Sequence, residues 1–113
     1  MTARRPPIPV VPEVPIACTL DTGAARAQLD EWRSVLSAAV LSTHRENPST
    51  TRMELAPGSD LAPIVALARR EVECCSFFRF AIEIDARTNT LIVSVPPDAA
   101  PILDAFAALA PTT

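Results

Sequence analysis

The sequence contains no lysine and no tyrosine, and it has one histidine, one tryptophan and three cysteines among 113 residues. Its ten basic residues are all arginines scattered along the chain, and the formal net charge is −3. A general nucleic-acid surface needs clustered basic residues, so this class of partner is excluded. No run approaches the ~20 consecutive apolar residues of a membrane helix. We therefore expect a cytoplasmic protein with neither a nucleic acid nor a membrane as partner.

Three cysteines are an odd number in a short chain, which argues against a disulfide framework. Reduced thiols or a metal site fit better. A lipoprotein signal ending at Cys18 is disfavoured, because Glu13 and several prolines interrupt its apolar stretch.

Composition divides the chain into two parts. Residues 1–14 are rich in proline and predict a disordered, polyproline-type leader. Residues 15–110 have the length and apolar content of one domain, with a mostly aliphatic core because aromatic residues are few. We therefore expect a single α+β domain at residues 15–110.

Hydrophobic periodicity predicts seven elements in the order β-α-β-α-β-β-α. The predicted strands are 15–20, 50–55, 78–84 and 91–95, the predicted helices are 22–40, 60–75 and 98–109, and residues 43–49 are a predicted loop. The expected buried stripes are Ala25, Leu29, Trp32, Leu36 and Ala39 in the first helix and Leu61, Ile64, Val65, Ala68, Val72 and Cys75 in the second. Each strand has one apolar face, which predicts a two-layer sandwich. In it a four-stranded sheet carries the helices on one face, as a ferredoxin-like variant.

The cysteines are the candidate functional residues. Cys74 and Cys75 are adjacent where the second predicted helix ends, and Cys18 lies on the apolar face of the first predicted strand. Soft thiolates select ions such as Zn²⁺, Cu⁺, Hg²⁺ and As(III). If the three sulfurs converge, Cys18, Cys74 and Cys75 form a metal site. Zinc would want a fourth ligand, and His44 is the one histidine in the chain.

The surroundings of the cysteine pair favour a bound cation over a catalytic nucleophile. The pair lies at the negative, C-terminal end of a predicted helix, beside Glu71 and Glu73. Both features disfavour a thiolate that has no counter-ion. A bound metal ion reverses this effect, because its ligands are deprotonated on coordination and nearby carboxylates then help. We predict no catalytic residue. We expect Glu71 and Glu73 to lie next to the metal ligands and to adjust the properties of the site without binding the ion themselves.

The stretch from Glu71 to Phe78, Glu-Val-Glu-Cys-Cys-Ser-Phe-Phe, resembles a motif of small, mostly uncharacterised actinobacterial proteins. The resemblance covers about residues 16–109 and includes a strand with a central cysteine, a Glu-Trp-Arg helix, a hairpin and a final Pro-x-x-Ala helix. Similar modules accompany MerR-type regulators and heavy-metal resistance. The resemblance implies soft-metal binding, and it implies that Cys18, Cys74 and Cys75 act together as the ligands. This chain lacks the winged-helix DNA-binding part of those regulators.

These observations favour a small protein that binds a soft heavy metal or metalloid ion through Cys18, Cys74 and Cys75. One alternative is an organomercurial-lyase-like enzyme in which Glu71 or Glu73 delivers a proton. Another is a non-metal interaction or ligand-binding domain whose cysteines act as small core hydrophobes. A vicinal disulfide that works as a redox switch also stays open. Besides the ion, a second copy of the chain in a homodimer is a candidate partner.

Overall fold

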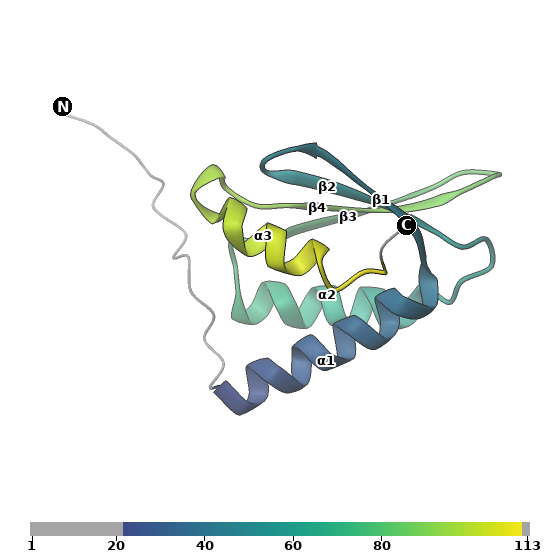
Figure 1. Ribbon diagram of the computed structural model, residues 1–113. Coiled ribbons are helices and arrows are strands. Elements are labelled where there is room, and N and C mark those ends of the chain that lie inside the picture. The colour runs from purple at the N-terminus through teal and green to yellow at the C-terminus, as the bar shows by residue number, and fades with distance from the viewer. Residues whose placement is uncertain (1–21, 112–113) are drawn as a thin grey trace.

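The computed structural model describes residues 22–111, which follow the order α-β-β-α-β-β-α (Figure 1). A short 3-10 turn, η1, precedes the last helix. The elements are α1 Thr22–Ala39, β1 Val40–Asn47, β2 Thr50–Leu55, α2 Ala62–Cys74, β3 Arg79–Ile84, β4 Asn89–Ser94, η1 Pro97–Ala99 and α3 Ala100–Ala107.

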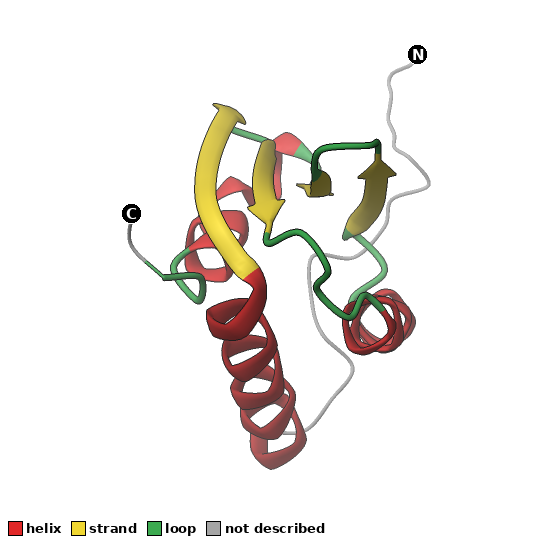
Figure 2. Ribbon diagram, turned by 90° about the vertical axis from the view of Figure 1, so that its right-hand side faces the viewer, coloured by secondary structure: helices red, strands yellow, loops and turns green. Residues whose placement is uncertain are grey.

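The four strands form one antiparallel sheet in the order β1-β2-β4-β3. Two hairpins, β1-β2 and β3-β4, are joined through the pairing of β2 with β4. All three helices lie on the same face of this sheet (Figures 1 and 2). The structure thus confirms an α+β fold with a four-stranded sheet. The predicted element order and the ferredoxin-like arrangement are not confirmed.

The loop predicted at residues 43–49 is wrong, because most of this stretch belongs to β1. Thr43 pairs with Met53 and His44 pairs with Arg52 of β2. Its sequence is polar because β1 is an edge strand with one solvent-facing side, where few apolar residues are needed. The strand predicted at residues 15–20 and the proline-rich leader at 1–14 lie outside the described residues.

The hydrophobic core fills the space between the sheet and the helices. Trp32 has no exposed surface; its ring stacks on Phe80 with centroids 5.5 Å apart and meets Phe106 edge-on at 4.9 Å. Aromatic contacts of this kind stabilise a core beyond the area they bury. Trp32 is therefore a core residue, as the sequence predicts. Fully buried aliphatic side chains complete the core, among them Leu36, Met53, Leu55, Ile64, Leu91, Val93 and Leu103.

The buried face of α1 agrees with the prediction at Trp32, Leu36 and Ala39 but not at Leu29, whereas the buried face of α2 is rotated from the predicted one. In α1 the position expected for Leu29, which is exposed, is taken by the buried Gln28. In α2 the residues Val65 and Val72 are exposed, and the buried residues are Ile64, Leu67, Glu71 and Cys74. Each helix therefore presents one polar side chain, Gln28 or Glu71, to the interface between them.

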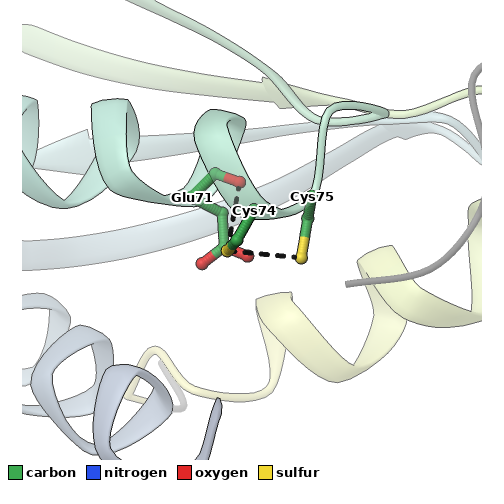
Figure 3. A group of neighbouring side chains, drawn as sticks. All are labelled: Glu71, Cys74 and Cys75. Carbon is green, nitrogen blue, oxygen red and sulfur yellow. Dashed lines mark hydrogen bonds between the residues drawn. The ribbon is translucent and has the colours of Figure 1, made fainter. Parts of the chain in front are cut away.

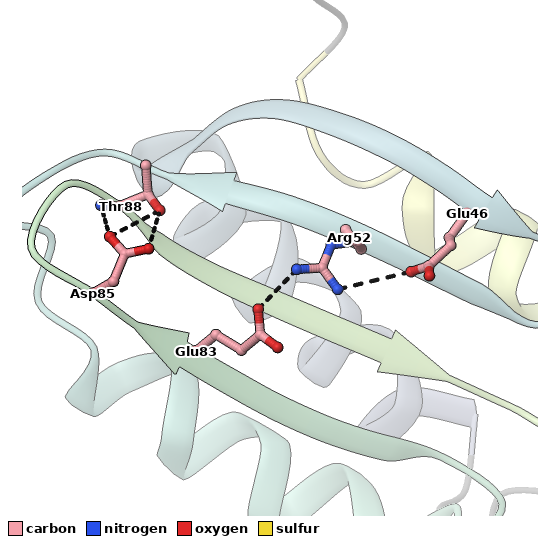
Figure 4. Close-up of polar contacts among 5 residues, drawn as sticks. All are labelled: Glu46, Arg52, Glu83, Asp85 and Thr88. Carbon is pink, nitrogen blue, oxygen red and sulfur yellow. Dashed lines mark hydrogen bonds and ion pairs between the residues drawn. The ribbon is translucent and has the colours of Figure 1, made fainter.

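The face of the sheet that carries no described helix is polar. Arg52 of β2 lies there between Glu83 of β3, at 2.8 Å, and Glu46 of β1, at 3.8 Å (Figure 4). Because these side chains are partly solvated, each pair contributes at most about 1 kcal/mol to stability. His44 is exposed and, by strand alternation beside Arg52, belongs to this same face.

The β3-β4 turn gives a pH-dependent contribution to stability. Hydrogen bonds to the Asp85 carboxylate from the backbone N–H of Thr88, at 2.8 Å (Figure 4), and from that of Arg87, at 2.7 Å, hold the pKa of Asp85 below its ordinary value of 3.8. A lowered pKa stabilises the fold above that ordinary value, and the contribution disappears as the pH falls through the folded-state pKa.

We therefore expect Asp85→Asn to destabilise the protein at neutral pH and to lose this disadvantage on acidification. Urea unfolding of both proteins from about pH 6 to about pH 2 measures the difference. A difference in unfolding free energy that stays constant over this range would contradict the role given to Asp85.

Candidate metal site

The end of α2 brings three ligand atoms together: a carboxylate oxygen of Glu71 and the sulfurs of Cys74 and Cys75 (Figure 3). These atoms all lie within 4.8 Å of one another, and the two sulfurs are 3.7 Å apart. All three residues are buried. Their side chains point from α2 toward the side on which α1 and α3 lie (Figure 3). The group is close enough to hold a metal ion.

The helix end itself produces this arrangement. Glu71 and Cys74 are three residues apart and so share one helix face. Cys75 is the first residue beyond the helix, and its N–H donates to the Glu71 carbonyl oxygen at 2.7 Å. The thiol of Cys74 lies 3.5 Å from the same carbonyl. The last turn of α2 therefore holds the two cysteines side by side, and the buried Phe77 and Phe78 anchor the chain that follows.

Two side chains of α1 hold the Glu71 carboxylate in place. Gln28 Nε2 donates to Glu71 Oε1 at 2.9 Å, and Trp32 Nε1 donates to the same oxygen at 2.8 Å. Gln28 Nε2 also lies 3.4 Å from Cys74 Sγ. A buried carboxylate is tolerated only when such bonds replace its lost hydration. The two helices thus fix the carboxylate beside the sulfurs before any ion binds.

The charges around the group suit a cation. The C-terminal end of a helix carries a partial negative charge, and Glu71 adds a carboxylate. The neighbouring Arg70 is paired with Glu31 of α1. Both side chains of that pair are about half exposed, so the arginine charge is solvated at the surface. A bound cation would therefore meet a negative environment in a buried site, where electrostatic interactions are weakly screened.

The predicted site residues do not all lie together in the structure. It brings Cys74 and Cys75 together, whereas Cys18 lies outside the described residues and stays a prediction. Glu71, expected to lie behind the ligands, is buried with its carboxylate in the group itself, beside the two sulfurs. Glu73 is exposed and lines an open groove with Val65 and Val72. It therefore faces away from the sulfurs.

His44, considered as a fourth zinc ligand, belongs to the polar face of the sheet, and the helices and the cysteine pair lie on the other face (Figure 1). Gln28, the other side chain that contacts the site from α1, is not among the residues predicted from the sequence. Its spacing could have identified it, because Gln28, Trp32 and Leu36 are four residues apart and so lie on the same face of α1.

Comparisons with known proteins add no assignment: no protein-family model, no curated protein and no solved structure matches the chain. The resemblance of the cysteine motif to small actinobacterial proteins therefore stays an expectation. Within residues 22–111, none of the helices combines the length and the apolar character needed to cross a membrane.

Proposed function

We propose that this protein binds a soft or borderline metal or metalloid ion through the sulfurs of Cys74 and Cys75, with the carboxylate of Glu71 as a third ligand. The observation that supports this function is the buried group of two sulfurs and one carboxylate, held from α1 by Gln28 and Trp32. Thiolates provide the selectivity for soft ions. The carboxylate and the helix end balance the charge of the ion.

The distance between the two sulfurs favours an ion with bent coordination. Two Zn–S bonds of about 2.3 Å that meet at the tetrahedral angle place their sulfurs about 3.8 Å apart. Bonds of the same length in a linear arrangement would separate them by about 4.6 Å. The observed distance of 3.7 Å matches the first case. Zn²⁺ and pyramidal As(III) could therefore bind Cys74 and Cys75 with little change in the sulfur–sulfur distance, whereas a linear two-coordinate ion such as Hg²⁺ or Cu⁺ requires the sulfurs to move apart.

Glu71, Cys74 and Cys75 provide fewer ligands than a structural zinc site needs, so Cys18 can be a further ligand. Structural zinc sites have four protein ligands, and Glu71, Cys74 and Cys75 supply three. A thiolate from Cys18 would complete a four-ligand zinc site. With the cysteine pair it would equally make the three-thiolate set that suits As(III). Cys18 thus belongs to the proposal as the predicted additional ligand.

Thiol accessibility in the native protein tests this function. In the presence of one equivalent of Zn²⁺ or of arsenite, Cys74 and Cys75 should be protected together from alkylation, as read by mass spectrometry of the peptides. Because a thiol must lose its proton to coordinate, protection should weaken as the pH falls. The Cys18→Ser variant, treated in parallel, shows whether the pair binds without the third thiol.

Alkylation of Cys74 and Cys75 that is measurable in the ion-free native protein and proceeds at the same rate with these ions would contradict the proposal. In that outcome the cysteines are core residues, and the protein acts as an interaction or ligand-binding domain.

One observation favours a second candidate function, the cleavage of carbon–mercury bonds. The Glu71 carboxylate lies within 4.8 Å of both sulfurs, so it could relay a proton. Both thiols would lose their protons as the two sulfurs bond to the mercury of an organomercurial cation. One proton would pass through Glu71 to the carbon as the carbon–mercury bond breaks, and the other would leave to solvent. Release of one hydrocarbon per mercury bound separates this reaction from binding alone.

A further inference from the structure

The two edges of the sheet are built differently. The pairing of β1 with β2 has register irregularities near both ends of β1, and Arg45 of β1 pairs with Asp104 of α3 at 2.6 Å. Irregular strands and covering elements protect an edge from further pairing. By contrast, β3 pairs with β4 in unbroken register. Within residues 22–111 no strand pairs with the outer edge of β3.

Apolar surface lies beside this open edge. An open groove of about 410 Å³ runs between β3 and α2, which lies under the β3 side of the sheet (Figure 2). Two of its lining residues, Val65 and Val72, are about 40% exposed, and Ile84 at the end of β3 is 68% exposed. A regular edge strand flanked by exposed aliphatic side chains is a surface on which another strand can pair.

The sequence of β3 complements itself when the strand is reversed. We propose that β3 pairs antiparallel with β3 of a second copy, about a two-fold axis at Ala81. In this register Arg79 lies opposite Glu83 of the partner subunit, and Glu83 lies opposite the partner subunit's Arg79. On the helix side, Phe80 lies opposite Ile82 of the partner subunit. Oppositely charged and apolar cross-strand pairs both stabilise a sheet.

Both charged residues are available for this contact. Arg79 and Glu83 are exposed on the polar face of the sheet, and Glu83 keeps 62% of its side chain exposed while it pairs with Arg52. The pair of Arg79 with Glu83 of the partner subunit occurs twice in the dimer, because a two-fold interface repeats every contact. The result is one eight-stranded sheet. The Glu71 and cysteine group lies on the buried face of α2, and none of its ligand atoms belongs to β3, so the proposed contact does not require bound metal.

A charge exchange across the axis tests the proposal. In sedimentation velocity over a concentration series, the full-length chain should form dimers of twice 12.1 kDa. Arg79→Glu places two glutamates opposite each other and should weaken dimerisation by about tenfold or more. Glu83→Arg should do the same, and the Arg79→Glu, Glu83→Arg double variant should restore it. Arg79 and Glu83 are about 13 Å apart along one strand, so contact within a subunit cannot cause this rescue.

Arg87→Glu, an exposed substitution in the β3-β4 turn, is the matched control and should leave dimerisation unchanged. A wild-type chain that stays monomeric at all concentrations would overturn the proposal, and would fit an edge occupied by another segment of the chain. A dimer that tolerates Arg79→Glu, or that the double variant does not restore, would overturn it as well.

Discussion

Replacement of Cys74 and Cys75 by serine should weaken binding of Zn²⁺ and As(III) by more than about 100-fold. Loss of residues that merely support metal ligands already costs about 10–100-fold in affinity, and these two residues are the ligands themselves. A serine hydroxyl stays protonated at neutral pH and is a hard donor, so it does not replace a thiolate. Competition with a chromophoric chelator measures the change in affinity.

Ser76→Ala is the matched control for the cysteine substitutions, because Ser76 is exposed and directly follows the pair. It should bind metal as the wild type does. A Cys74→Ala, Cys75→Ala variant removes the buried hydroxyls that serine introduces, and it separates lost ligands from a disturbed core. Wild-type affinity in a folded serine or alanine variant would show that the pair does not bind the ion.

The second large effect concerns the buried carboxylate. Glu71→Leu should lower the free energy of unfolding by about 2–4 kcal/mol, because the N–H groups of Gln28 and Trp32 would both lose their buried acceptor. Glu71→Gln keeps an acceptor oxygen and should cost about 1 kcal/mol. It removes the charge, however, and should weaken metal binding by about 10–100-fold. Urea unfolding and chelator competition measure the two effects separately.

A double-mutant cycle makes this prediction specific. Trp32→Phe keeps an aromatic ring in the core and removes the N–H that donates to Glu71. Since the two side chains are in contact, the cost of Trp32→Phe should shrink when Glu71 is already leucine, with a coupling of about 0.5–3 kcal/mol. Additive costs would show that the bond between Trp32 and Glu71 does not support the site. A Glu71→Leu protein as stable as the wild type would contradict the role of both donors.

The proposed metal binding offers a reason for a buried carboxylate at this position. Replacing a buried charged group together with its polar partners by well-packed apolar side chains is commonly neutral or stabilising, although removing one member alone is destabilising. The surface between α1 and α2 nevertheless holds Glu71 with two donors directed at one oxygen. A charge kept beside two sulfurs is useful when a cation binds there. A protein in which Glu71 and both of its donors were replaced by well-packed apolar side chains could therefore be more stable than the wild type without bound metal.

The sequence predicts those elements in which apolar periodicity dominates. The strands β2, β3 and β4 alternate clearly, and prolines mark the start of α2 and α3. Strand β1 was missed because its residues from Ser42 to Asn47 are all polar. Its strand conformation comes from pairing with β2, which a local pattern does not contain.

The candidate site could be predicted only in part for a similar reason. The adjacent cysteines and the nearby glutamates are visible in the sequence, and so is the negative helix end. Which face of α2 is buried depends on a hydrogen bond to a residue 43 positions earlier, Gln28. A hydrophobicity rule therefore buries Val65 and Val72 and exposes Glu71, whereas the structure does the opposite. Paired polar residues at a helix interface defeat such rules, because each makes the burial of the other tolerable.

X-ray absorption at the metal edge of the protein loaded with one equivalent of Zn²⁺ or arsenite tests the central claim most directly. Coordination by Cys74, Cys75 and Glu71 predicts at least two sulfur neighbours, with zinc–sulfur distances of about 2.3 Å, together with an oxygen neighbour in the zinc form. A third sulfur neighbour in the spectrum would show that Cys18 is also a ligand. A spectrum with oxygen and nitrogen neighbours alone would contradict the assignment of the cysteine pair as the metal site.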